Sequence, residues 1–285
     1  PREIYAAVGL RRATTNETLQ PDHKGWIHRY HAENGEDPND GDLQSFKRLM
    51  KPAQPSEGVE HIYGLARGSY GTPLRSCLYA ASSDGLFRVD LDTHQETLLG
   101  GPLQIEPGNE FDMRTDGDFR DLVVDAQGAL FCAAWDKRDG SYGDNPPHYY
   151  RENCYVFRAV LDPYGMEEFS LDAVFAVGGQ DGSRKLVHLA ADQLLDGLLY
   201  ASYTGSGGAT GLWRRTSPNV WNSLLTTSGF GPGMGWVYAG WRNTAGLTGW
   251  ACAAGASGLV FAGDLFLLWK NLGGDGAIGT WRNRW

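Results

Sequence analysis

Apolar and polar residues alternate in short runs along much of the chain, a pattern typical of half-buried β-strands. In Leu86–Leu91, for example, every second residue from Phe87 on is apolar and the residues between them are charged. One segment, Asp42–Met50, instead places Leu43, Phe46 and Leu49 at a spacing that fits a helix and an outer strand equally well. The pattern therefore predicts an all-β protein with at most one short helix.

Two short sequence phrases recur along the chain. The first is a large apolar residue, an aromatic residue and two small residues, found at 4–7, 78–81, 130–133, 199–202, 237–240 and 260–263. The second is an aromatic residue beside an apolar one, usually with Arg close behind, found at 26–29, 86–89, 156–159, 212–215 and 280–283. The aromatic residues of the second phrase are 61, 70, 56 and 68 residues apart. This degenerate period of about 60 residues indicates a repeat architecture.

Each period is long enough for four antiparallel strands with their loops. Three copies predict strands at 59–63, 77–82, 85–90 and 96–99; at 121–125, 129–134, 155–161 and 169–176; and at 185–190, 198–203, 211–216 and 220–226. Further strand-like pieces lie at 235–241, 248–253, 259–268 and 279–285.

A repeated four-stranded unit of this kind resembles the blade of a β-propeller. Leu122–Phe131 in particular is similar to the inner strand, turn and second strand of many propellers. Five copies of the second phrase predict five blades, and six copies of the first leave six blades as the alternative. We expect one domain over residues 1–285, closed by a blade that mixes N- and C-terminal strands. A β-sandwich followed by a small β domain is a less favoured alternative.

Composition and charge narrow the class of partner. Gly and Pro together number 52 of 285 residues, from 39 Gly and 13 Pro, which disfavours a helical bundle. The net charge of −9 argues against a nucleic-acid partner, because such proteins carry a basic surface. No apolar run is long enough to span a membrane and no signal peptide is visible, so we expect a soluble protein. Extracellular and virion-associated locations both stay open.

Long loops are predicted to gather on one face of the propeller. In a four-stranded meander, the loops between second and third strands share a face with the connections between blades. These loops are long here, at 8–25, 136–153, 204–211 and 264–279, with the blade connections at 100–118, 176–184 and 228–235. Long loops often carry function, so this face is the expected binding surface.

The loop 136–153 is the richest in binding side chains. Tyr, Trp and Arg offer flat apolar area and directional donors, as glycan and protein interfaces require. The predicted ligand-binding residues are Trp135, Arg138, Tyr142, His148, Tyr149, Tyr150 and Arg151. Packing of these aromatic residues against their own blade is the alternative.

Carboxylates near the starts of inner strands are the candidates for catalysis. A pair of carboxylates at the right separation can cleave a glycosidic bond. Glu60 and Asp121 are the catalytic candidates, with Glu57, Asp118, His61, Arg120 and His188 nearby. The alternative is that these carboxylates are solvated loop residues with no part in catalysis.

Cysteine and metal patterns are sparse. The four Cys residues form no C-x-x-C pair, so no zinc site is predicted, although Cys132 and Cys154 are candidates for a cross-strand disulfide. Ca²⁺ is the only candidate ion, at Asp136, Asp139, Asp144 and Asn145, but their spacing does not match an EF-hand. We therefore predict no cofactor.

These observations favour a non-catalytic recognition propeller that binds a glycan or a protein surface through its long-loop face. It would act within a larger assembly, such as a virion or cell surface. The loops differ between repeats, so one composite site is expected rather than five equal ones. The alternatives are a glycan hydrolase with carboxylates in the central channel and a purely structural subunit.

Overall fold

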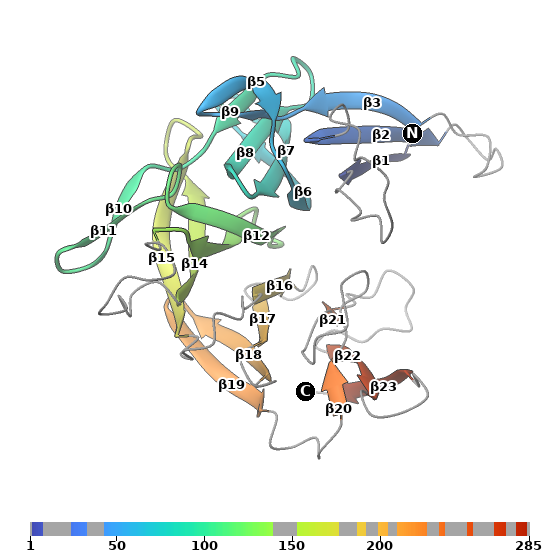
Figure 1. Cartoon of the computed structure of the whole chain (residues 1–285), viewed down its shortest axis with the longest axis vertical. Coiled ribbons are helices and arrows are strands. Elements are labelled where there is room, and N and C mark those ends of the chain that lie inside the picture. Colours follow the sequence, from blue (N-terminus) through green and yellow to red (C-terminus); the bar gives the residue numbers. More distant parts are fainter. Residues whose placement is uncertain are drawn as a thin grey trace, which may run out of the picture. The chain divides into compact units, whose positions relative to one another are not determined.

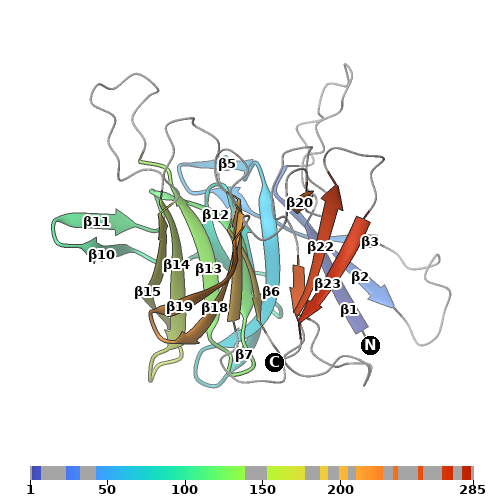
Figure 2. The ribbon, with the colours of Figure 1, turned by 90° about the horizontal axis from the view of Figure 1, so that it is seen from below.

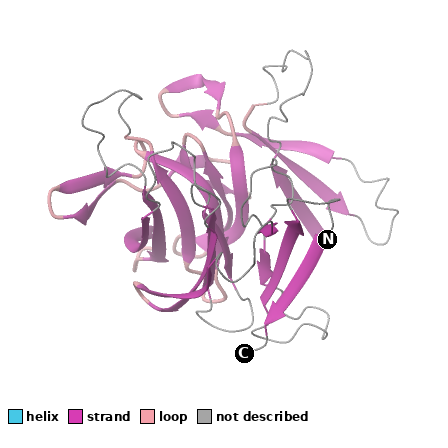
Figure 3. Ribbon diagram, turned by 60° about the horizontal axis from the view of Figure 1, so that its bottom comes forward, coloured by secondary structure: helices cyan, strands magenta, loops and turns pink. Residues whose placement is uncertain are grey.

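The computed structural model shows a chain built from antiparallel β-sheets (Figures 1 and 3). It describes residues 2–7, 24–32, 43–138, 153–176, 187–191, 199–204, 210–226, 234–236, 250–252, 265–271 and 278–283. The chain divides into two compact units, Pro1–Leu122 with Leu161–Glu167, and Val123–Val160 with Glu168–Trp285. Over these described ranges every regular element is a strand, and no helix capable of crossing a membrane is found.

The first sheet contains most of the segment 42–50, for which the sequence allowed either a helix or an outer strand. Its strands β1 (Arg2–Ala7), β2 (Trp26–Ala32) and β3 (Leu43–Arg48) pair in that order. The segment is therefore the strand β3 and not a helix, because its backbone pairs with β2 from Trp26 to Tyr30. Phe46 is buried, with its ring 5.1 Å from that of Tyr5. A short hairpin, β4 (Met50–Lys51) with β5 (Gln54–Gly58), follows.

The second sheet is the clearest four-stranded meander. It consists of β6 (Ile62–Tyr70), β7 (Arg75–Ser82), β8 (Gly85–Asp90) and β9 (Glu96–Leu98), paired in chain order. Every residue of β8 is buried, as are the last six of β7, so these strands form the centre of the sheet. Apolar side chains from β7 and β8 join those of β2, β6 and the flanking segments in one core, which includes Ile27, Leu49, Val59, Ile62, Leu78 and Phe87.

A hairpin that the sequence did not predict interrupts the next connection. β10 (Pro102–Glu106) and β11 (Asn109–Asp112) pair within the segment 100–118, which was expected to be a loop. Figure 2 shows them as a separate two-stranded arm. β10 buries none of its residues fully, so its apolar signal is weak, and Gly108 turns the chain with a φ of 81°.

The remaining strands repeat the meander twice and then change order. One sheet pairs β12 (Gly117–Val124), β13 (Leu130–Asp136), β14 (Asn153–Leu161) and β15 (Glu167–Ala176) in chain order. The next does so with β16 (Val187–Ala191), β17 (Leu199–Thr204), β18 (Thr210–Ser217) and β19 (Val220–Thr226). The last sheet consists of β20 (Met234–Trp236), β21 (Trp250–Cys252), β22 (Leu265–Asn271) and β23 (Ile278–Asn283). In it, β20, β21 and β23 each pair with β22.

Three sheets thus correspond in chain order to the three predicted four-stranded copies, although β6 begins at Ile62 rather than at 59 and β12 at Gly117 rather than at 121. The predicted bounds agree fully for β8 and β19, at 85–90 and 220–226. All-β architecture with antiparallel meanders is therefore confirmed. The number of blades, closure by mixed terminal strands and the single domain stay predictions.

The candidate disulfide between Cys132 and Cys154 is not formed. Both thiols are free and buried. The hairpin register places Cys132 opposite Phe157 and Cys154 opposite Trp135, so the two cysteines are three positions out of alignment. That offset along a strand exceeds the Cα separation of about 4.4–6.8 Å that a disulfide allows. Burial raises the pKa of the Cys132 thiol, as expected for an inert core residue.

Candidate functional site

The segment before β6 lies against the turn between β7 and β8. The backbone N–H of Ser83 donates to the carbonyl of His61 at 3.1 Å, and the N–H of Glu60 donates to Asp84 Oδ2 at 3.1 Å. The hydroxyl of Ser83 donates to the same Asp84 oxygen at 2.9 Å. The segment that leads into β6, the first strand of this sheet, therefore lies beside the turn between β7 and β8, its second and third strands. This is the side on which the sequence predicted functional loops.

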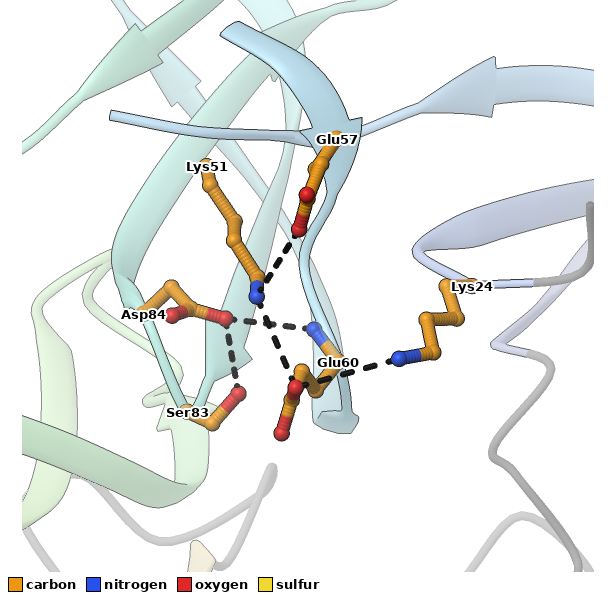
Figure 4. A network of polar contacts seen from close by, with 6 residues as sticks. All are labelled: Lys24, Lys51, Glu57, Glu60, Ser83 and Asp84. Carbon is orange, nitrogen blue, oxygen red and sulfur yellow. Dashed lines mark hydrogen bonds and ion pairs between the residues drawn. The ribbon is translucent and has the colours of Figure 1, made fainter. Parts of the chain in front are cut away.

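A network of charged side chains covers this junction (Figure 4). Lys51 Nζ lies 3.5 Å from Glu60 Oε1 and 3.4 Å from Glu57 Oε2, while Lys24 Nζ lies 3.8 Å from Glu60 Oε1. The side chain of Glu60 is 50% exposed and that of Lys51 is 18% exposed. We call these residues and their hydrogen-bonded neighbours the Lys51 network; its members are Lys24, Lys51, Glu57, Glu60, Ser83 and Asp84.

The carboxylates of the Lys51 network keep the Lys51 ammonium charged. Burial alone would lower the pKa of Lys51, but Glu60, Asp84 and Glu57 together raise it above its ordinary value. The network therefore presents an ammonium donor beside carboxylate acceptors, with half of the Glu60 side chain open to solvent.

His61 and Tyr63 follow Glu60 of the Lys51 network along the chain, and the Tyr63 ring lies beside Arg120 of β12. The rings of His61 and Tyr63 have centroids 5.6 Å apart. The guanidinium carbon of Arg120 lies 4.3 Å from the centre of the Tyr63 ring, within cation–π range. Arg120 Nη2 also donates to Asp118 Oδ2 in an ion pair in which the Arg120 side chain is only 6% exposed. Asp118 therefore compensates a buried charge.

Asp121 is placed by the close approach of β6 to β12. Its Oδ1 accepts a hydrogen bond from the backbone N–H of Leu122 at 2.8 Å. A Cβ added to Gly64 would lie 3.1 Å from this oxygen, so the absence of a side chain at Gly64 allows the approach. In the first unit, Glu60 and His61 directly precede β6 and Glu57 lies on β5, while Asp118, Arg120 and Asp121 lie on β12. Asp121 was expected at the start of its strand, but it lies in the middle of β12, because this strand begins at Gly117. His188 lies on β16 in the other unit.

We expect His61 to make stability fall in mild acid. Burial lowers the pKa of His61, and Arg120 and Lys24 act in the same direction against Glu60 and Asp118. The unfolded chain, with a pKa of about 6.5, then binds the proton more readily, so this contribution is complete above that pH and is lost as the pH falls below it. Urea unfolding at pH 7.5 and 5.5 should show a smaller acid loss in His61→Gln than in the wild type. Equal losses would contradict this assignment.

Two of the predicted ligand-binding residues, Trp135 and Arg138, lie at the base of the loop 136–153 and contact other residues of the second unit. Trp135 is partly buried and packs against the core that contains Phe131, Val156 and Leu189. Arg138 Nε and Nη2 donate to the two carboxylate oxygens of Asp136 at 2.9 and 2.7 Å. The other predicted ligand-binding residues and calcium ligands lie outside the described residues: Tyr142, His148, Tyr149, Tyr150, Arg151, Asp139, Asp144 and Asn145.

Two buried ion pairs were missed by the sequence prediction. Arg88 Nη1 lies 2.5 Å from Glu167 Oε2, and Arg215 Nη2 lies 2.8 Å from Asp172 Oδ1. The signal was present, because both arginines belong to the recurring phrase in which Arg follows an aromatic residue. Within the described ranges no group of His, Cys, Asp or Glu has the arrangement of a metal site.

Comparisons with known proteins assign no family. No family model matches the chain, and no curated protein matches it. A solved structure described as a gluconolactonase has 14% identity and a TM-score of 0.37 over 70% of this chain and 55% of its own. An ancestral GH74 enzyme has 12% identity and a TM-score of 0.34 over 91% of this chain and 42% of its own. A puromycin-hydrolysing peptidase of Mycobacterium tuberculosis has 10% identity and a TM-score of 0.35, with coverages of 92% and 42%. The chain thus spans about half the length of these proteins.

Proposed function

We propose that the protein is a β-propeller that recognises a glycan without cleaving it, and that the Lys51 network and the adjoining rings form its binding surface. The observation that supports this is the pairing of charges at the starts of β6 and β12. Glu60 is held between Lys24 and Lys51, and Asp118 is paired with Arg120. These carboxylates are engaged in ion pairs, which suits a binding surface better than acid–base catalysis.

The same surface has the chemistry that hydroxyl groups need. A sugar hydroxyl both donates and accepts hydrogen bonds, so it pairs well with an ammonium group next to a carboxylate. Lys51 and Glu60 provide such a pair in partly exposed positions, 3.5 Å apart. The neighbouring ring of Tyr63, half-buried and backed by Arg120, offers a flat face for the C–H side of a sugar.

A binding measurement on a glycan array tests this proposal. The wild-type protein should be retained by at least one class of glycan, and Glu60→Gln should weaken that binding about tenfold, because one charge-assisted hydrogen bond contributes roughly 1.5 kcal/mol or more. Glu106→Gln, on the β10–β11 hairpin, makes the same chemical change at an exposed position and should bind like the wild type.

Two outcomes would overturn the proposal. Retention of no glycan by the wild type would favour a protein surface as the partner or a purely structural subunit. Equal glycan binding by Glu60→Gln and the wild type would move the site to another surface, with the loop 136–153 as the first candidate.

A further inference from the structure

A pocket of about 400 Å³ opens on the second unit between β15, β18 and β19. It is lined chiefly by Asp172, Val174, Phe175, Trp213, Asn219 and Trp221. This volume lies within the roughly 300–1,000 Å³ of small-molecule sites. The pocket is independent of the Lys51 network, which belongs to the first unit.

Three aromatic rings form the wall of the pocket. The ring of Phe175 lies 5.8 Å from that of Trp213 and 5.6 Å from that of Trp221, edge to face in both cases. Phe175 is buried, while Trp213 and Trp221 are partly buried residues that pack against the same core. The β18–β19 register pairs Arg215 with Trp221 and Trp213 with Ser223, so both Trp residues extend from one face of this strand pair. The wall therefore presents flat apolar area to a ligand.

Asp172 offers no hydrogen-bonding capacity to a ligand. Its Oδ1 accepts from Arg215 Nη2 at 2.8 Å and from the backbone N–H of Asn219 at 3.3 Å. Its Oδ2 accepts from Arg215 Nε at 2.8 Å and from Trp221 Nε1 at 2.9 Å. A carboxylate has about four acceptor positions, and all are used here. Arg215 neutralises the charge, so neither a cation nor an anion finds a counter-charge in this pair.

These contacts restrict the class of ligand. A sugar needs several hydrogen bonds, but the one lining group with an exposed polar side chain is Asn219, which lies at the tight turn between β18 and β19 with a φ of 62°. We propose that the pocket binds a neutral, planar aromatic ring that stacks on the Trp residues and carries a single polar group towards Asn219. This inference does not depend on the proposed glycan function.

Indole is the appropriate first probe, because it is neutral, planar and has one N–H group. Titration of the full chain followed by ligand-observed NMR should show saturable binding of indole and none of methyl β-D-glucopyranoside at the same concentrations. Binding of the sugar without binding of indole would contradict the proposal. Binding of neither would do the same.

Substitutions at exposed positions locate the site without disturbing the core. Val174 is 41% exposed and lines the pocket, so Val174→Arg should weaken indole binding at least tenfold by filling the space. Val220 is 45% exposed on β19 and does not line the pocket, so Val220→Arg should bind within twofold of the wild type. Asn219→Gly keeps the left-handed turn and should weaken binding about threefold or more. Equal affinity of Val174→Arg and Val220→Arg would overturn the assignment.

Discussion

Replacing Arg215 with Met is expected to lower the free energy of unfolding by about 3–5 kcal/mol, because it leaves a buried carboxylate without its counter-charge. The side chains of Asp172 and Arg215 are 2% and 7% exposed, so solvent cannot take the place of the guanidinium. The two Arg215 nitrogens bind both Asp172 oxygens at 2.8 Å, the bidentate geometry that gives the strongest ion pairs.

Urea unfolding of Arg215→Met and of the double variant Asp172→Leu with Arg215→Met measures this effect. The double variant should be more stable than Arg215→Met, since no charge is then left buried. Arg114→Met is the matched control. Arg114 pairs with Asp112 at 3.1 Å on the surface, and its loss should cause no measurable change. A cost for Arg215→Met as small as that of the control would contradict the burial of this pair.

Replacing Glu167 with Ala is expected to destabilise the first unit by a similar amount, about 3–5 kcal/mol. Glu167 is 3% exposed at its side chain and accepts hydrogen bonds from Tyr79 at 2.8 Å and Arg88 at 2.5 Å. The guanidinium of Arg88 also lies 3.7 Å from the centre of the Tyr70 ring. Loss of the carboxylate therefore leaves the buried Arg88 cation without the counter-charge that neutralises it.

Tyr79→Phe separates the charge from the hydrogen bond in this cluster. It removes one donor to Glu167 and keeps the ion pair with Arg88, so it should cost only about 1 kcal/mol. Both variants can be compared by urea unfolding at pH 7.5. If Glu167→Ala costs no more than Tyr79→Phe, the ion pair does not stabilise the segment Leu161–Glu167 against β7 and β8.

The strand order of the three meanders could be predicted from the sequence, because strongly apolar strands such as β7 and β8 carry a clear pattern. The hairpin β10–β11 could not, since its residues are mostly exposed and lack that pattern. The segment 42–50 was ambiguous because its apolar spacing suits a helix and a strand alike. Pairing with β2 decided it, and such pairing depends on residues distant in the sequence.

The candidate site was predictable in part. The sequence placed Glu60 and His61 directly before a strand, where the structure has them, but it expected Asp121 at the start of a strand and this residue lies in the middle of β12. Lys24 and Lys51 were missed, because they come from separate segments that only the fold brings to Glu60. The register of β13 with β14 could not be predicted from the sequence either, since the long loop between them fixes no alignment. This register decides that the candidate pair Cys132 and Cys154 do not face each other.

The most direct test of recognition without cleavage is to incubate the protein with the glycan that it retains and to analyse that glycan by mass spectrometry. We predict that the glycan is recovered intact after prolonged incubation, and that its binding is weakened in Glu60→Gln. Shortened products that appear with the wild-type protein, and fail to appear with Glu60→Gln or Asp121→Asn, would contradict the account and establish a hydrolase.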